Sequence, residues 1–211
     1  MSVPPFASLR AAVAEGAPAL VVVAGPNGAG KSTFIDLYVQ RLGLPYVNAD
    51  HIARILKAAQ PALSQCELDQ RAFEEAERLR DDMLELRLGF CTETVFSDPV
   101  GSKLDFLDRA RTAGFFVTLV FIGLEHPGIS IGRVQQRVAR GGHDVPVDRL
   151  RARFPRTLEN LRAAIPIVNE VFLFDNSSAD VPYRFAARYA DGQLVAHHPP
   201  LPRWTRGLPG L

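Results

Sequence analysis

Hydrophobic residues in this chain fall into two kinds of segment, which alternate along the sequence. Short runs of consecutive apolar residues, many of them β-branched or aromatic, are typical of strands that are buried on both faces. They occur at residues 20–24, 44–48, 90–96, 115–122 and 171–174. Longer segments carry apolar residues at helical spacing with polar residues between them. These segments predict helices at residues 8–14, 31–42, 52–59, 67–88, 101–113, 129–140 and 150–165.

Strands that alternate with helices favour an α/β fold with right-handed crossovers. We expect a P-loop-type parallel sheet of about five strands with helices on both faces, in one domain that spans residues 1–211. Residues 183–195 are compatible with a hairpin around Asp191-Gly192. The tail at residues 198–211 contains four prolines and is expected to be extended and loosely held.

Composition narrows the class of protein without identifying it. Hydrophobic residues make up 47% of the 211 residues, and 24 basic side chains nearly balance 23 acidic ones. Nothing global therefore points to a nucleic acid or membrane partner. The two cysteines suit neither a disulfide framework nor a metal cluster, which indicates a reducing compartment. With no apolar stretch like that of a signal peptide, we expect a cytoplasmic protein.

The strongest chemical signal is a glycine-rich turn between the first strand and the helix that follows it. Its Gly-x-x-x-x-Gly-Lys-Ser pattern is that of a P-loop, and the predicted ATP-binding residues are Gly25, Pro26, Asn27, Gly28, Ala29, Gly30, Lys31, Ser32 and Thr33. The glycines let successive backbone N–H groups point at phosphate oxygens, and the helix adds the positive end of its dipole. Lys31 is predicted to reach the β- and γ-phosphates, and Ser32 to hold Mg²⁺.

The P-loop alone does not choose between a GTPase switch, an ATP-driven motor and a small-molecule kinase. Guanine specificity would require an Asn-Lys-x-Asp motif, which the sequence lacks. A motor would carry an apolar strand that ends in Asp-Glu, and neither 115–122 nor 171–174 does so, although Asp175 follows the second. The polar residues at the other strand ends must therefore decide the class.

Two of those strand ends carry candidate acceptor-side residues. Asp50 follows the second strand, where its carboxylate could accept the proton of a substrate hydroxyl during phosphoryl transfer. The alternative is that Asp50 is the N-cap of the helix at 52–59. Glu93 and Thr94 end the third strand, where a glutamate is costly to bury unless it is partnered. Substrate hydroxyls or amides would be suitable partners, and a plain alternation of faces at a sheet edge is the alternative.

Arginines are dense between residues 133 and 156, with Gly141-Gly142 as a hinge. This arrangement favours a closing lid whose guanidinium groups neutralise a transferring phosphoryl group. Arg137, Arg140 and Arg153 are our candidates, whereas others of the cluster must belong to a solvated helix face. A nucleic-acid patch is the weaker interpretation, because acidic residues interrupt the cluster.

These motifs, in this order, resemble the zeta-toxin family of P-loop kinases, in particular its short chromosomal members. The matching segments cover most of residues 20–177. They are Gly25-Pro-Asn-Gly-Ala-Gly-Lys-Ser-Thr33, Asn48-Ala-Asp50, Phe90-x-x-Glu-Thr-Val-x-Ser97, Gly114-Phe-x-Val-x-Leu119, Arg133-Val-x-x-Arg137-Val-x-x-Gly141-Gly-His-x-Val-Pro146 and Phe174-Asp-Asn-Ser177. The last three are distinctive in combination, whereas a P-loop alone fits many families.

The resemblance implies an ATP- and Mg²⁺-dependent kinase of a sugar-nucleotide hydroxyl, typically the sugar 3′-hydroxyl of UDP-N-acetylglucosamine. It implies that Asp50 accepts the proton, that Glu93 and Thr94 bind the substrate, and that Arg137 is a lid arginine near the phosphates. Arg140 and Arg153 are both within reach as a second lid arginine, and Asn176 is placed near the adenine of ATP. A partner antitoxin follows by family analogy.

Two other functions stay open from the residues alone. One is a P-loop kinase of another hydroxyl, such as that of a nucleoside or an RNA end. The other is a non-catalytic ATP-binding module of a toxin–antitoxin pair.

Overall fold

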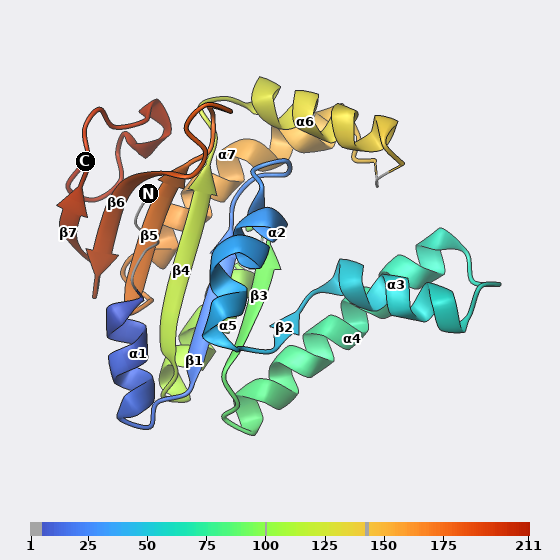
Figure 1. Cartoon of the computed structure of the whole chain (residues 1–211), viewed down its shortest axis with the longest axis horizontal. Coiled ribbons are helices and arrows are strands. Elements are labelled where there is room, and N and C mark those ends of the chain that lie inside the picture. The colour runs from blue at the N-terminus through green and yellow to red at the C-terminus, as the bar shows by residue number, and fades with distance from the viewer. Residues whose placement is uncertain (1–5, 100, 142–143) are drawn as a thin grey trace.

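The computed structural model of the chain describes residues 6–99, 101–141 and 144–211. The described strands are β1 (Ala19–Ala24), β2 (Tyr46–Val47), β3 (Phe90–Thr94), β4 (Phe116–Gly123), β5 (Glu170–Asp175), β6 (Arg184–Ala190) and β7 (Gln193–His197). They form one sheet in the order β2-β3-β1-β4-β5-β6-β7 (Figure 1). The first five in that order pair in parallel, and β6 and β7 are antiparallel.

The predicted α/β class with a mostly parallel sheet is confirmed, but the sheet has seven strands rather than about five. The two additional strands are the hairpin around Asp191-Gly192, which extends the sheet beyond β5. Strand β6 mixes buried and partly exposed positions, and the edge strand β7 is mostly exposed, as antiparallel strands at the side of a sheet can be. They therefore lack the continuous apolar run that marks the central strands.

Seven α-helices connect or flank the described strands. They are α1 (Ala7–Ala14), α2 (Lys31–Phe34), α3 (Ala49–Ala59), α4 (Gln65–Glu85), α5 (Ser102–Thr112), α6 (Pro127–Ala139) and α7 (Val147–Ala164). The predicted helix at 31–42 is continuous in space, but after α2 it becomes a π-helical turn (Ile35–Val39) and a 3₁₀ turn (Gln40–Leu42). The helix predicted at 150–165 is α7, which runs through Pro155 without interruption.

The sheet has a hydrophobic core on each face, as the continuous apolar run of β1 predicts. Leu20, Val22 and Ala24 belong to the core that α5 and α7 cover, whereas Val21 and Val23 belong to the core that α1 and α2 cover. Helix α6 lies beyond the carboxyl ends of the central strands, and the α3–α4 pair extends away from the sheet (Figure 1). None of the helices described is long and apolar enough to cross a membrane.

The tail at residues 198–211 is packed onto the sheet, so the expectation of a loosely held tail is wrong. Trp204 is 6% exposed and lies against Phe121, with ring centroids 5.6 Å apart. A Cβ atom on Gly123, the last residue of β4, would lie 2.3 Å from the Trp204 indole, so this indole needs glycine there. The tail contains a 3₁₀ turn at Arg203–Thr205, and the apolar Trp204 and the buried Leu208 hold it to the core.

Candidate active site

The P-loop connects β1 to α2 at the carboxyl ends of the parallel strands (Figure 1). Gly25 and Gly30 have φ angles of 143° and 90°, which favour glycine. At Gly25 a Cβ atom would also lie only 2.2 Å from the Ile122 carbonyl oxygen on the neighbouring strand β4. The loop therefore adopts the backbone conformation that the glycine pattern predicts, and at Gly25 it packs closely against strand β4.

Lys31 is almost buried at the first turn of α2. Its ammonium group donates hydrogen bonds to the Gly25 and Pro26 carbonyl oxygens, each at 3.1 Å. Burial lowers the pKa of Lys31 from its ordinary value, while the nearby Glu93 carboxylate acts in the opposite direction. The lysine thus folds back over its own loop, from where it lines the cavity that the loop borders.

Glu93 lies beside the P-loop because β3 pairs in parallel with β1, which brings Val23 and Glu93 into register. The Ser32 hydroxyl donates to the Glu93 carboxylate at 3.0 Å, and the Asn48 amide donates to it at 2.8 Å. Glu93 is therefore partnered, as its partly buried position requires. The sequence did not indicate that it would meet Ser32.

The Ser32 hydroxyl and the Glu93 carboxylate are oxygen donors of the kind that Mg²⁺ prefers. Within the described part of the chain, no three His, Cys, Asp or Glu side chains gather as a metal cluster. Such a sparse donor set fits Mg²⁺, which takes one or two protein oxygens and completes its shell with phosphate and water. It does not fit a site made wholly of protein ligands.

Asp50 lies in the first turn of α3 and lines the same cavity as the P-loop. The alternative that it caps α3 is wrong, because the cap is Asn48, whose side-chain oxygen accepts the His51 backbone N–H at 3.0 Å. Asn48 uses its amide nitrogen for Glu93 and for the Tyr46 hydroxyl. One asparagine thus begins the helix that carries Asp50 and also orients Glu93.

Two cavities meet at the carboxyl end of β3. The P-loop cavity, of about 420 Å³, is lined by the loop, by Asp50 and by Arg133 and Arg137 of α6. The β3 cavity, of about 470 Å³, lies between α4, β3, α5 and α7. The residues that line both are Ala49, Glu93, Thr94 and Val95. The two cavities therefore share a wall at Glu93 and Thr94.

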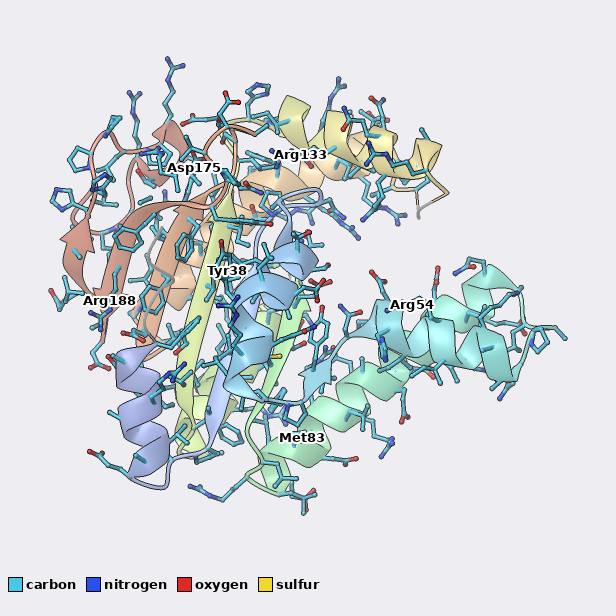
Figure 2. All side chains as sticks on the ribbon, in the orientation of Figure 1. Tyr38, Arg54, Met83, Arg133, Asp175 and Arg188 are labelled. Atoms are coloured by element: carbon cyan, nitrogen blue, oxygen red, sulfur yellow. The ribbon has the colours of Figure 1, made fainter. Side chains whose placement is uncertain are left out.

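The arginines of the predicted lid segment differ in the cavity that they line. Arg137 and Arg133 are four residues apart on α6 and both line the P-loop cavity, and Arg133 also donates to the Gly28 carbonyl oxygen at 3.3 Å (Figure 2). Arg153 lines the β3 cavity instead. Arg140, at the end of α6, is exposed and lines neither. The selection from sequence had not included Arg133, although its spacing from Arg137 could have suggested it.

The β3 cavity has a cationic and partly aromatic wall. Arg153 and Arg156 of α7 and Lys103 of α5 line it, with the rings of Phe73 and Phe106. Burial and the neighbouring Arg149 and Arg156 guanidinium groups lower the pKa of Arg153. Gly142 of the predicted Gly141-Gly142 hinge and the neighbouring His143 lie outside the described residues.

Asn176 lies beneath the P-loop rather than across the cavity from it. Its amide nitrogen donates to the Ala29 carbonyl oxygen at 2.8 Å, and its side-chain oxygen accepts the Tyr183 N–H at 3.2 Å. The side chain is buried, and both of these bonds are within the protein. Contact with adenine therefore stays a prediction, whereas contact with the P-loop is observed.

Two comparisons of the sequence with known proteins bear on its family. A family model described as Zeta toxin matches residues 7–184. An uncharacterized protein of Haemophilus influenzae is 28% identical over 130 residues, which are 62% of this chain and 88% of that protein.

Two solved structures share the fold. The AvrRxo1-ORF1:AvrRxo1-ORF2 complex with sulphate ions matches with a TM-score of 0.69 at 17% identity, over 89% of this chain and 63% of that chain. The PezAT toxin–antitoxin system of Streptococcus pneumoniae matches with a TM-score of 0.56 at 14% identity, over 90% of this chain and 76% of that chain. This chain thus spans less than two thirds of the AvrRxo1 chain that it matches. With most of its length matched by the family model, the chain belongs to the Zeta toxin family, and it has a P-loop kinase-like fold.

Proposed function

We propose that this protein is an ATP-dependent kinase that phosphorylates a hydroxyl of a sugar nucleotide, with UDP-N-acetylglucosamine as the first candidate. The observation that carries the proposal is the shared wall of the two cavities. The P-loop and Asp50 line one cavity, which meets the other at Glu93 and Thr94. A phosphate donor and a hydroxyl acceptor can thus approach each other from the two sides of this wall.

The donor half follows from P-loop chemistry. The loop N–H groups and Lys31 would hold the phosphates of ATP. Ser32 and Glu93 would hold Mg²⁺, which supplies neutralisation of phosphate charge when it is bound. Arg137 would place a guanidinium group near the γ-phosphoryl group as it transfers. Arg140 is the weaker candidate for a second lid arginine, because it lines neither cavity.

On the acceptor side, Asp50 would take the proton of the acceptor hydroxyl as its oxygen attacks the γ-phosphorus. The bond from the γ-phosphorus to the bridging oxygen then breaks, and ADP leaves with that electron pair. Glu93 and Thr94 would bind sugar hydroxyl or amide groups at the shared wall. The cationic residues of the β3 cavity, Arg153 among them, suit the diphosphate of a sugar nucleotide.

The decisive experiment incubates the protein with ATP, Mg²⁺ and a panel of UDP-sugars, nucleosides and RNA 5′ and 3′ ends. We expect one sugar nucleotide to become one phosphate heavier by mass spectrometry. Asp50→Ala should slow that transfer by about 10²- to 10⁴-fold, the usual contribution of a general base. Its ATP affinity should stay within about twofold, because the proposal assigns Asp50 to the proton of the acceptor hydroxyl and not to the ATP phosphates.

Asp108→Asn is the matched control, since Asp108 is an exposed carboxylate on α5. Transfer to no acceptor, despite tight ATP binding, would reject the kinase and favour the non-catalytic ATP-binding module. Transfer only to an RNA end, with binding that weakens steeply as salt rises, would favour the alternative kinase.

We also propose an antitoxin partner, supported by the PezAT neighbour, whose structure comes from a toxin–antitoxin system. Growth arrest on expression of the chain, relieved by a co-expressed neighbouring reading frame, would support it. Growth arrest that persists in Asp50→Ala would separate toxicity from phosphoryl transfer.

A further inference from the structure

The carbonyl groups of the P-loop are held by side chains, most of which come from distant parts of the chain. Six successive carbonyl oxygens, from Gly25 to Gly30, each accept a side-chain hydrogen bond. The donors, in loop order, are Lys31 for the first two, then Ser130, Arg133, Asn176 and Tyr183. The last two donors, Asn176 and Tyr183, are uncharged side chains from the segment between β5 and β6, and each of their bonds is 2.8 Å long.

Peptide geometry gives these bonds a consequence for ligand binding. A trans peptide unit is planar, with its C=O and the following N–H on opposite sides. A side chain that holds the Ala29 carbonyl therefore orients the Gly30 N–H away from itself. The same holds for the Gly30 carbonyl and the Lys31 N–H. These N–H groups lie at the start of α2, where a P-loop presents donors to phosphate oxygens.

Asn176 and Tyr183 form one unit against the loop. The Asn176 side-chain oxygen accepts the Tyr183 backbone N–H, so each residue helps to fix the other. A Cβ atom on Gly30 would lie 2.7 Å from the Tyr183 hydroxyl oxygen and 2.8 Å from the Asn176 amide nitrogen. Both polar groups therefore lie directly against the loop.

The C-terminal tail supports this unit through Asp175. Asp175 directly precedes Asn176 in the chain. Its carboxylate accepts the Trp204 indole N–H at 3.1 Å and the Ser177 hydroxyl at 2.6 Å. The Asn176 N–H also donates to the Gly123 carbonyl oxygen at 3.0 Å, next to the place where Trp204 covers Gly123. A chain of contacts thus runs from the tail to the P-loop.

We propose that Asn176 and Tyr183 are positioning residues of the nucleotide site, and that Trp204 supports them through Asp175. They hold the Ala29 and Gly30 carbonyls so that the Gly30 and Lys31 N–H groups face the phosphates. The inference rests on the proposed function only in that the P-loop binds ATP. Its test measures binding apart from transfer.

The competing explanation is that Tyr183 only fills space. Its ring packs against Phe34 and Tyr38, with centroids 5.3 and 6.1 Å away, in a buried aromatic cluster. If packing were its whole role, the hydroxyl could be removed without effect on nucleotide binding. Tyr38 belongs to the same cluster, but in the described part of the chain its hydroxyl bonds to no P-loop carbonyl. It is therefore a matched control.

The experiment measures ATP dissociation constants by calorimetry for Tyr183→Phe, Asn176→Asp and Tyr38→Phe. Loss of one neutral hydrogen bond should raise the ATP Kd of Tyr183→Phe about three- to tenfold. Asn176→Asp should raise it by more than about tenfold, because a carboxylate oxygen would then face the Ala29 carbonyl oxygen. Tyr38→Phe should leave Kd within about twofold, and KM for the acceptor should not change in any variant.

A second readout separates positioning from a role in stability. Amide exchange at residues 28–31 of the nucleotide-free protein should quicken in Tyr183→Phe, while the global Tm stays close to that of the unaltered chain. Trp204→Phe, which keeps a ring but loses the N–H donor, should show a smaller rise in ATP Kd of about two- to threefold. An unchanged ATP Kd in both Tyr183→Phe and Asn176→Asp would overturn the inference.

The two proposals fail in different ways. If ATP Kd rises as expected in these variants but no acceptor is phosphorylated, the positioning role stands and the kinase function fails. If the unaltered chain phosphorylates an acceptor while all variants bind ATP equally well, the kinase stands and the positioning role is overturned.

Discussion

The P-loop cavity and the β3 cavity differ in what their walls are made of. The P-loop presents backbone groups whose carbonyls are already bonded to side chains such as Asn176 and Tyr183. The β3 cavity presents side chains instead, with the guanidinium of Arg153 and the half-exposed ring of Phe73. A triphosphate is the same for every acceptor, so rigid backbone donors suit it. Acceptor selection needs side-chain chemistry, which can differ without altering the fold.

The largest expected effect concerns the support of the P-loop side. Trp204→Ala should destabilise the protein by about 3–5 kcal/mol, because it leaves a cavity against Phe121 and Gly123. For a chain of this length, that corresponds to a fall in Tm of roughly 6–20 °C by calorimetry. Trp204→Phe should recover part of that loss. A Tm unchanged by Trp204→Ala would mean that the tail does not support the sheet in solution.

A smaller effect is expected at Glu93, in the wall that the two cavities share. Glu93 lines both and bonds to Ser32, so Glu93→Gln should impair both sides. Loss of a charge-assisted contact should cost about 1.5–3 kcal/mol, or about 10- to 150-fold in kcat/KM. Titration with Mg²⁺ should also show weaker metal binding, so that a higher Mg²⁺ concentration is needed for half-maximal transfer. Glu85→Gln, an exposed change on α4, is the control. An effect on one substrate alone would place Glu93 in one cavity only.

A more selective effect is expected from the cationic wall. Arg153→Ala should raise KM for the acceptor at least about tenfold while KM for ATP changes little, because Arg153 lines the β3 cavity only. Arg151→Ala, at an exposed position of the same helix, should change neither constant. If KM for ATP rises instead, Arg153 acts in the lid and the assignment of the cavities is wrong.

The smallest expected effect concerns the rigidity of β3 itself. Cys91 is buried in β3, and burial raises its pKa to about 12, whereas Cys66 is exposed at the start of α4. Since the thiolate is the reactive form, iodoacetamide at pH 8 should label Cys66 and spare Cys91. Peptide mass spectrometry would check this. Labelling of Cys91 at a comparable rate would show that the β3 wall opens in solution.

Local patterns predicted the central part of the fold well and its margins poorly. The runs at 20–24 and 115–122 became β1 and β4, because uninterrupted apolar residues suit only strands covered on both faces. The four prolines of the tail restrict its backbone, and on that basis the sequence predicts an extended, loosely held segment. The apolar contacts of Trp204, which the local sequence does not show, decide where it lies.

The candidate site divides in the same way. The sequence predicts the P-loop, Asp50 and Arg137 as site residues, and Asp50, Arg137 and most of the P-loop line one cavity, whereas Gly25, Pro26 and Ala29 do not. The same pattern could not tell that Asn48 caps α3 in place of Asp50. Either residue type can cap a helix, and the choice depends on where the backbone leaves β2.

The sequence by itself determined the P-loop, because its chemistry depends on glycines and a lysine in consecutive positions of the backbone. Only the tertiary structure decided what surrounds it. Glu93 meets Ser32 across 61 residues, and Asn176 meets Ala29 across 147. Such contacts depend on strand order and register, which many segments set together, so no local pattern shows them.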